Sequence, residues 1–309
     1  MSPLAAELPF DRPAYAEALR YLGEPVVVAG RPLVLRPVPG TDAVDAFGPF
    51  PYGSPPQDAD ALQRALAALG VVTLTCVLRP GCDTRGLEKL DPVEVKEHFV
   101  LRRSEPTIVP SSRTRRHLRR AATNWSVELR EMADAIDLAD RLHRLLESRA
   151  PLSRVARVDR RHFEVLAGIE GFGCAVATAH GRDSAFLVFA ETADQIHFHL
   201  TAGDEDALRD DGMYALFDFM VRTYSPTRDL YLGGLPSGPN GAGVARFKAR
   251  FANARVPVSM VRLVVDAGCC SDLVARLGRH PWFPPYRDPA ADQGPAMQTM
   301  TSPPVRQNG

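Results

Sequence analysis

The chain has 309 residues, of which 45% are hydrophobic and 24% are charged, and its 37 basic residues balance its 37 acidic residues. This length predicts two domains, each large enough to bury an ordinary core. A formal charge of zero argues against a dedicated nucleic-acid coat protein or a membrane-surface protein, although a local basic patch can still act.

The N-terminal sequence MSPLAAELPFDRPAY has acids and prolines where a signal peptide needs a basic start and an apolar run. No stretch of the chain is apolar for long enough to span a bilayer. The five cysteines form no CxxC pair and are odd in number, which favours a reducing compartment without structural zinc. We therefore expect a cytoplasmic protein.

The first third of the chain alternates helical and extended patterns, which fits an α/β layer fold. The segment 37–56 between two of these patterns is dense in glycine and proline, so we expect neither a helix nor a central strand there. The predicted elements are a helix over 11–22, two strands within 25–39, a helix over 58–69, a strand over 71–78 and a strand within 87–103.

A basic segment follows at residues 111–121, where two serines can cap a helix. It contains no acid, so it should carry a positive field that suits the phosphates of a nucleic acid or of a phosphorylated acceptor. A simply solvated basic face is the alternative. Its arginines are Arg113, Arg115, Arg116, Arg119 and Arg120.

The second half of the chain predicts a new module. Its elements are a strand over 125–129, helices over 133–148 and 161–169, three strands of an antiparallel meander within 174–203, a helix over 210–224 and a strand over 230–232. From residue 281 the sequence is rich in proline, glutamine and small polar residues, which predicts a disordered tail.

The stretch from Tyr231 to Asn253 is the best candidate for chemistry. A strand end leads into a glycine- and proline-rich loop, and a short amphipathic segment with the sequence FKARF follows. Free backbone amides at a helix start, glycines that allow close approach and a lysine one turn later suit a phosphate or a carboxylate. A solvated strand-to-helix loop is the alternative, and the lack of Gly-Lys-Ser/Thr excludes a nucleotide P-loop.

Four segments, in this order, resemble those of Fem-like transferases, the tandem GNAT-fold proteins that include peptidoglycan-bridge aminoacyltransferases. They are FGPFPYGSPP at 47–56, SSRTRRHLRRA at 111–121, IHFHL at 196–200, and LGG at 232–234 followed by FKARF at 247–251. Leu235 stands where the family has a third glycine, and Ser54 stands where it has a second aromatic residue. The element order of the second half is also that of a GNAT core.

The resemblance implies an α/β (α+β) fold with two tandem GNAT-like domains, each a mixed, largely antiparallel sheet flanked by helices. We expect the N-terminal domain over 1–123, ending in the basic helix, and the C-terminal domain over 124–282, with the tail over 283–309. The repeat in the N-terminal half rests mainly on the resemblance.

The resemblance also implies the site. Lys248 would neutralise charge at the reaction centre as a catalytic residue, and His199, in the family's YHL position, would be the second. Serine-hydrolase chemistry is poorly supported because no G-x-S-x-G elbow occurs. A metal site is also poorly supported, because His197 and His199 have no third ligand at a characteristic interval. The implied substrate-binding residues are Tyr52, Arg113, Arg116, Gly233, Gly234, Phe247 and Arg250.

The expected activity is amide formation by transfer of an amino acid from aminoacyl-tRNA, a co-substrate, to an amine on a cell-wall precursor or small metabolite. No other cofactor and no metal are expected. The place of a coenzyme A pyrophosphate loop holds GDEDALRDDGMYAL, whose five acids around Gly212 would repel a pyrophosphate. The alternatives are an acetyl-CoA-dependent GNAT N-acetyltransferase and a non-catalytic protein that binds RNA or a partner.

Overall fold

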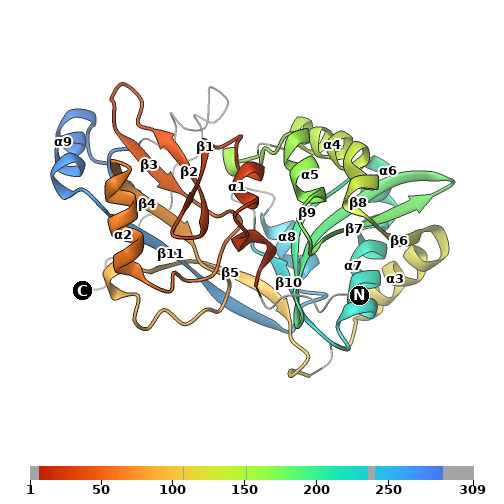
Figure 1. Cartoon of the computed structure of the whole chain (residues 1–309). Coiled ribbons are helices and arrows are strands. Elements are labelled where there is room, and N and C mark those ends of the chain that lie inside the picture. The colour runs from red at the N-terminus through yellow and green to blue at the C-terminus, as the bar shows by residue number, and fades with distance from the viewer. Residues whose placement is uncertain (1–6, 107, 151, 236–240, 288–309) are drawn as a thin grey trace.

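The computed structural model describes residues 7–106, 108–150, 152–235 and 241–287. One mixed sheet of eleven strands runs through both halves of the molecule in the order β1-β2-β3-β4-β11-β5-β10-β9-β8-β7-β6. Helices cover both faces of the C-terminal half of this sheet (Figure 1).

The N-terminal half begins with a short helical segment and a β-hairpin. The hairpin turn lies at Ala29 and Gly30, which both have positive φ, and this is the turn geometry that matches strand twist. The elements are η1 (Pro9–Asp11), α1 (Tyr15–Ala18), β1 (Glu24–Val28), β2 (Arg31–Pro37), β3 (Val44–Phe47), α2 (Ala59–Ala68), β4 (Val71–Val77), η2 (Glu88–Leu90) and β5 (Val93–Leu101).

The C-terminal half follows the order that the sequence predicts, and two further elements close the chain. Ser111 caps α3 by accepting a hydrogen bond from the Thr114 amide. The elements are α3 (Ser112–Asn124), β6 (Ser126–Arg130), α4 (Met132–Arg149), η3 (Arg154–Ala156), α5 (Arg160–Ala167), β7 (Phe172–Ala179), β8 (Arg182–Glu191), β9 (Gln195–Gly203), α6 (Glu205–Arg209), α7 (Gly212–Tyr224), β10 (Asp229–Gly233), α8 (Gly241–Lys248), β11 (Ala254–Val264) and α9 (Ala267–Leu277).

The two halves repeat one motif. In the first, β1, β2 and β3 form an antiparallel meander, and α2 connects β3 to the parallel strand β4. In the second, β7, β8 and β9 form the meander, and α6 and α7 connect β9 to the parallel strand β10. The expected tandem arrangement of two largely antiparallel, helix-flanked units is thus confirmed.

The halves are joined through shared strands. β10 pairs with β5 from the N-terminal half, and β11 lies between β4 and β5, antiparallel to both. The boundary predicted at residue 123 falls at the end of α3. Because residues 254–264 return to the N-terminal half, one cut in the chain does not separate the two halves.

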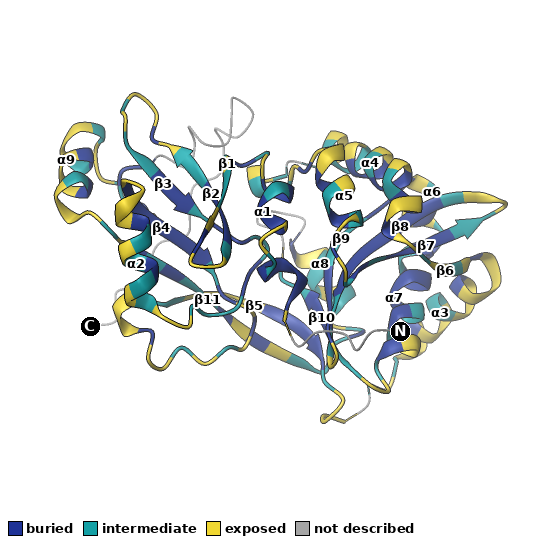
Figure 2. Cartoon of the chain, viewed as in Figure 1, coloured by how far each residue is buried: buried dark blue, intermediate teal, exposed yellow. Residues whose placement is uncertain are grey.

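Three hydrophobic clusters fix these elements. One lies between α4, α5 and one face of β7–β9, and it includes Phe10 and Tyr15 from the N-terminal segment. A second lies on the opposite face, beneath α3, α7 and α8. A third fills the space between α2 and strands β1–β4 and β11. Figure 2 shows the strands as largely buried and the helices as exposed on their outer faces.

Three sequence predictions need correction. The helix predicted over 11–22 contains only one regular turn of α-helix, α1. The segment predicted to lack a central strand contains β3, which lies between β2 and β4 because residues 43–47 are a short run without glycine or proline. The start of the predicted tail is folded, since Tyr286 is buried and Arg287 pairs with Asp45; residues 288–309 lie outside the described residues.

Within the described ranges, no helix combines the length and the apolar character needed to cross a membrane.

Candidate active site at the end of strand β10

The parallel strands β9 and β10 pair over a short distance and then diverge. Their register covers three residue pairs, the last of which joins Tyr231 to His197. Beyond it, β9 continues to Gly203, whereas β10 ends at Gly233 after bulging against β5. The pairing of β9 with β10 therefore ends just before the predicted glycine residues Gly233 and Gly234.

Lys248, the last residue of α8, reaches this strand end. Its Nζ donates a hydrogen bond to the Gly234 carbonyl oxygen at 2.7 Å. Burial, together with the charge of Lys96, lowers the pKa of Lys248 to about 8. No carboxylate contributes to this pKa, so the ammonium group is a partly buried cation without an acidic counter-charge at contact distance among the described residues.

Phe247 holds α8 in place. Its ring lies 4.8 Å from that of Phe217, 5.1 Å from that of Tyr214 and 5.4 Å from that of Phe251, measured between centroids. Such edge-to-face contacts stabilise a buried aromatic cluster. The structure therefore places the predicted substrate-binding residue Phe247 in the packing that orients Lys248.

The two predicted glycines lie directly at the strand end. Gly233 has a φ of +82°, and a Cβ at this residue would lie 3.2 Å from the Lys248 Nζ. A Cβ on Gly234 would lie 2.9 Å from the Cδ2 and Nε2 atoms of His98. Glycine is required at both positions because backbone, lysine and imidazole converge here. The next loop residues, 236–240, lie outside the described residues.

His98 is a site residue that the sequence analysis missed. It is 3% exposed on β5, and neither of its ring nitrogens has a hydrogen-bond partner in the described structure. Burial lowers the pKa of His98 to about 2, with contributions from Lys96, Lys248 and His197. A buried imidazole usually finds partners, so His98 has unused hydrogen-bonding capacity next to Lys248.

Tyr52 connects the N-terminal half to β9. Its hydroxyl lies 2.8 Å from the His197 Nδ1, and Gln195 Oε1 lies 3.0 Å from the other ring nitrogen of His197. The His197 ring stacks on Tyr231, with 4.5 Å between centroids. Tyr52 is 1% exposed, so in this structure it anchors its loop against β9.

His199 belongs to a different cluster. Its Nε2 lies 2.9 Å from that of His162 on α5, and its ring packs against Phe10. Burial and the neighbouring histidines lower its pKa well below the usual value. Within the described residues no contact joins His199 to Lys248, whereas His197 faces His98 and Tyr52.

The predicted basic helix α3 packs against α7 and exposes most of its arginines (Figure 2). Arg113 and Arg116 are exposed and have no carboxylate partner in the described part of the chain. Arg120 and His117, by contrast, both bind Asp211, at 3.1 Å and 2.8 Å. The positive field of α3 is therefore partly neutralised at its C-terminal end.

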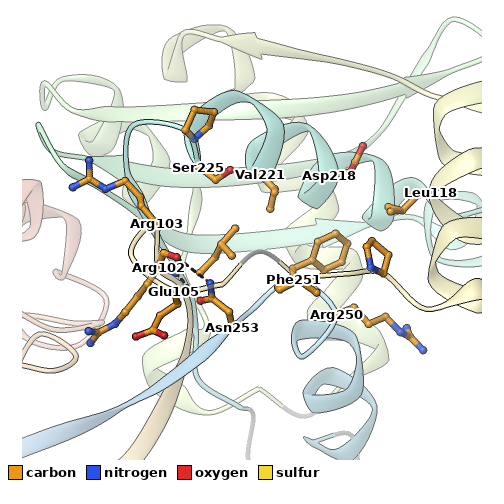
Figure 3. Close-up of a pocket in the computed structure, with 14 residues that line it drawn as sticks. Arg102, Arg103, Glu105, Leu118, Asp218, Val221, Ser225, Arg250, Phe251 and Asn253 are labelled. Atoms are coloured by element: carbon orange, nitrogen blue, oxygen red, sulfur yellow. Dashed lines mark hydrogen bonds between the residues drawn. The ribbon is translucent and has the colours of Figure 1, made fainter.

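Arg250 joins this basic surface. Its guanidinium donates to the Tyr214 hydroxyl and lies 5.6 Å from the Tyr214 ring centroid. Burial raises the pKa of Tyr214, and the charges of Arg250 and Arg113 both oppose this rise. A pocket of about 330 Å³ lies beside Arg250, between α3, α7 and the turn before β11. Figure 3 shows the guanidinium groups of Arg103 and Arg250 at opposite ends of this pocket, with Phe251 between them.

Gly212, which the sequence analysis compared with a pyrophosphate loop, is closely packed. A Cβ at Gly212, the first residue of α7, would lie 2.9 Å from the Ala207 Cα and 3.1 Å from the Trp125 Cζ2. The Trp125 indole also donates to the Asp210 carbonyl oxygen at 2.7 Å. The first turn of α7 is thus covered by α6 and Trp125.

Among the residues that the structure describes, no group of three or more His, Cys, Asp or Glu side chains could hold a metal ion.

The comparisons with known proteins concern the fold. A comparison with protein-family models finds no match, and a comparison with curated proteins finds none. Among solved structures, FemX superposes with a TM-score of 0.58 at 10% identity, over 86% of this chain and 93% of FemX. The C-terminal domain (DUF2156) of a protein assigned as a lysylphosphatidylglycerol synthetase from Agrobacterium fabrum gives 0.57 at 16% identity, over 81% of this chain and 87% of that domain.

A third structure, L-PGS from Bacillus licheniformis, gives a TM-score of 0.53 at 15% identity, over 85% of this chain and 92% of that chain. At these identities the similarity describes the fold, and it extends over nearly the full length of each relative. The resemblance to Fem-like transferases is confirmed at this level: the chain has the tandem GNAT-like fold of FemX.

Proposed function

We propose that the chain is an aminoacyltransferase that moves an amino acid from aminoacyl-tRNA to an amine acceptor and forms an amide bond. The observation that carries this proposal is the Lys248 ammonium group, held by the Gly234 carbonyl oxygen at the point where β9 and β10 diverge. Its position, together with the fold, suits stabilisation of an anionic acyl-transfer intermediate.

In the proposed reaction, the acceptor amine attacks the ester carbonyl carbon of the aminoacyl group. The carbon–nitrogen bond forms, the bond to the ribose oxygen breaks, and the proton lost by the amine is balanced by protonation of that oxygen. With a pKa of about 8, Lys248 is mainly protonated at neutral pH. Its remaining donor protons can therefore neutralise the oxyanion as it develops.

The basic surface supports a nucleic-acid donor. Arg113 and Arg116 on α3 and Arg250 beside the pocket present positive charge on one side of the C-terminal half. Guanidinium groups suit contacts with the phosphates of a nucleic acid. We assign these residues to the acceptor stem and terminal nucleotide of the tRNA.

A coenzyme A donor is less well supported. Ala207 and Trp125 pack against Gly212 at the start of α7, and the acids that flank this residue in sequence would repel a pyrophosphate. Asp204 and Asp206 bind Arg182 instead, so these acids also have a structural role.

The direct experiment incubates the protein with total tRNA charged with labelled amino acids and a panel of amine-bearing acceptors. The expected result is an RNase-sensitive, labelled amide product. A parallel reaction with acetyl-CoA tests the alternative donor. Acetylated product without aminoacyl product would replace this proposal with a GNAT N-acetyltransferase, and no product with either donor would favour a binding protein.

A further inference from the structure

The use of lysine in this chain is uneven. Of its 37 basic residues only three are lysines, Lys89, Lys96 and Lys248. Lys89 forms an ordinary exposed ion pair with Asp60 at 2.9 Å. The other two act on the same imidazole, because the charges of Lys96 and Lys248 both lower the pKa of His98.

The backbone explains why these groups meet. Lys96 and His98 are two residues apart on β5, so their side chains leave the same face of the strand. Lys248 approaches from α8 and binds the Gly234 carbonyl oxygen, and the Gly234 Cα is in contact with the His98 ring, as the 2.9 Å approach of a Cβ shows. Three nitrogen-bearing side chains thus converge on one strand end.

No acid balances them. No carboxylate contributes to the pKa of His98 or of Lys248. Glu97, which lies between Lys96 and His98 in sequence, points to the opposite face and pairs with Arg255 at 3.5 Å. Lys96 has no ion pair within the described residues, and both ring nitrogens of His98 are buried there without a partner.

We infer that Lys96, His98 and Lys248 form a subsite for one anionic group the size of a carboxylate or a phosphate. Two ammonium groups supply the charge that such a group needs, and the unpartnered His98 ring supplies a hydrogen-bond donor in a place with little water. The inference concerns binding, and only its use in catalysis rests on the proposed function.

The anion has two possible sources in the proposed reaction. A carboxylate next to the reacting amine of the acceptor would place that amine beside Lys248. A phosphate of the terminal nucleotide would instead come from the donor. The two sources predict different substrate dependences when Lys96 is neutralised.

Binding is tested first, without any reaction. Protein with 13C,15N-labelled histidine is titrated with inorganic phosphate and, separately, with acetate at constant ionic strength, and the His98 ring signals are assigned with His98→Asn. We expect a saturable shift of these signals. Lys96→Gln, a change at an exposed side chain, should weaken binding about fivefold because one contacting charge is lost, whereas Lys89→Gln should not. A His98 signal unaffected by both anions would overturn the subsite.

Initial rates then identify the source. If the acceptor supplies the anion, Lys96→Gln raises KM for an amino-acid acceptor and leaves KM for its carboxylate methyl ester unchanged. If the donor supplies it, KM for the charged tRNA rises instead. Unchanged KM values for every substrate would refute a role in catalysis. If the protein transfers nothing at all, the proposed function fails, and the titration still decides whether the anion subsite exists.

Discussion

Lys248 occupies a position that suits lysine, in a chain whose basic residues are mostly arginine. A guanidinium stays charged at any accessible pH, whereas an ammonium group responds to burial by a lower pKa. Here burial brings that pKa to about 8, close enough to neutrality for the charge to depend on pH. The side chain can therefore be tested through both its charge and its titration.

We expect Lys248→Ala to lower kcat/KM for aminoacyl transfer at least about tenfold, because an oxyanion loses its charged donor. Circular dichroism should remain unchanged, since Phe247 and not Lys248 anchors α8. Lys89→Ala is the matched control for lysine truncation. Wild-type turnover in Lys248→Ala would remove the residue from the mechanism.

The pH dependence gives a second test. Lys248 acts in its protonated form, so the wild-type rate should fall as pH rises through about 8. In Lys248→Arg the group stays charged above that pH, and the alkaline decline should disappear even if the maximal rate is lower. The measurement is kcat/KM between pH 6 and 10 with one acceptor for both proteins. An identical alkaline limb in both would assign the titration to another group.

Buried histidines make a separate prediction about stability. Burial lowers the pKa of His162 to about 4 and that of His197 to about 3. Burial also lowers the pKa of His199. Between pH 5 and 6 the unfolded chain binds protons that the folded chain does not, so the free energy of unfolding should decrease as pH falls below about 6.5. Each such histidine contributes up to about 1.4 kcal/mol per pH unit.

Urea unfolding at pH 7.5, 6 and 5 measures this decrease. His199→Leu should reduce the slope because one buried titrating group is removed, and His180→Asn, at an exposed turn residue, should leave it unchanged. A stability that does not vary over this range would show that the histidines are not buried and neutral in solution.

At the residue scale, the sequence analysis singled out residues that meet at the end of β10 but not the side chains that surround them. Lys248, Gly233 and Gly234 occur within one short segment, so the local sequence was enough to single them out. His98 lies about 150 residues away in sequence from Lys248, and nothing near it signals a site. The scarcity of lysine was the available clue, because two of the three lysines meet there. His197 and His199 are two residues apart on β9, and a bulge in the β8–β9 pairing at His199 and the different neighbours of each ring separate their environments.

At the element scale, local signals predicted most helices and strands. Ser111 caps α3 as expected, because a capping bond depends on residues three apart, and Asp58 caps α2 in the same way. The strand β3 was missed because four residues between prolines and glycines are too few for a period. Packing, not propensity, makes it a strand, since it fills the place between β2 and β4.

The helix α3 makes a prediction at this scale. The double variant Arg113→Gln/Arg116→Gln should weaken tRNA binding and reduce the slope of log Kd against log salt, by about 1.4 to 2 for two lost phosphate contacts. Filter binding between low and physiological salt measures both quantities.

The matched control is Arg64→Gln/Arg85→Gln, which removes two exposed arginines of the N-terminal half, one on α2 and one in the segment before η2. Its affinity and salt dependence should equal those of the wild type. If both double variants lose affinity equally, the effect follows net charge, and α3 is not the binding surface.

At the scale of the whole molecule, the repeat could be predicted, but the sharing of strands between its halves could not. Each half contains a meander followed by a helix and a parallel strand; this order is visible in the sequence of the C-terminal half, whereas in the N-terminal half it was expected mainly from the family resemblance. The pairing of β11 with β4 and β5 joins residues 154 to 191 positions apart, a distance at which sequence periodicity carries no information. The active-site candidate lies at this junction, so both halves contribute to it: His98 from one and Lys248 from the other.

The shared strand predicts that the N-terminal half cannot fold alone. Without β11, β4 and β5 would each lose a complete ladder, and apolar residues such as Val256, Val258 and Leu263 would no longer cover the core. Unpaired edges and missing apolar burial destabilise a sheet. We therefore expect a fragment of residues 7–123 to lack dispersed amide signals in NMR spectra. When the same fragment is joined by a flexible linker to residues 250–287, dispersed signals should appear. Both should be compared with a control in which Val256, Val258 and Leu263 are replaced by Asp, which should be unfolded. A 7–123 fragment that folds by itself would mean that β11 adds to a complete domain, and the boundary predicted at residue 123 would then be a true one.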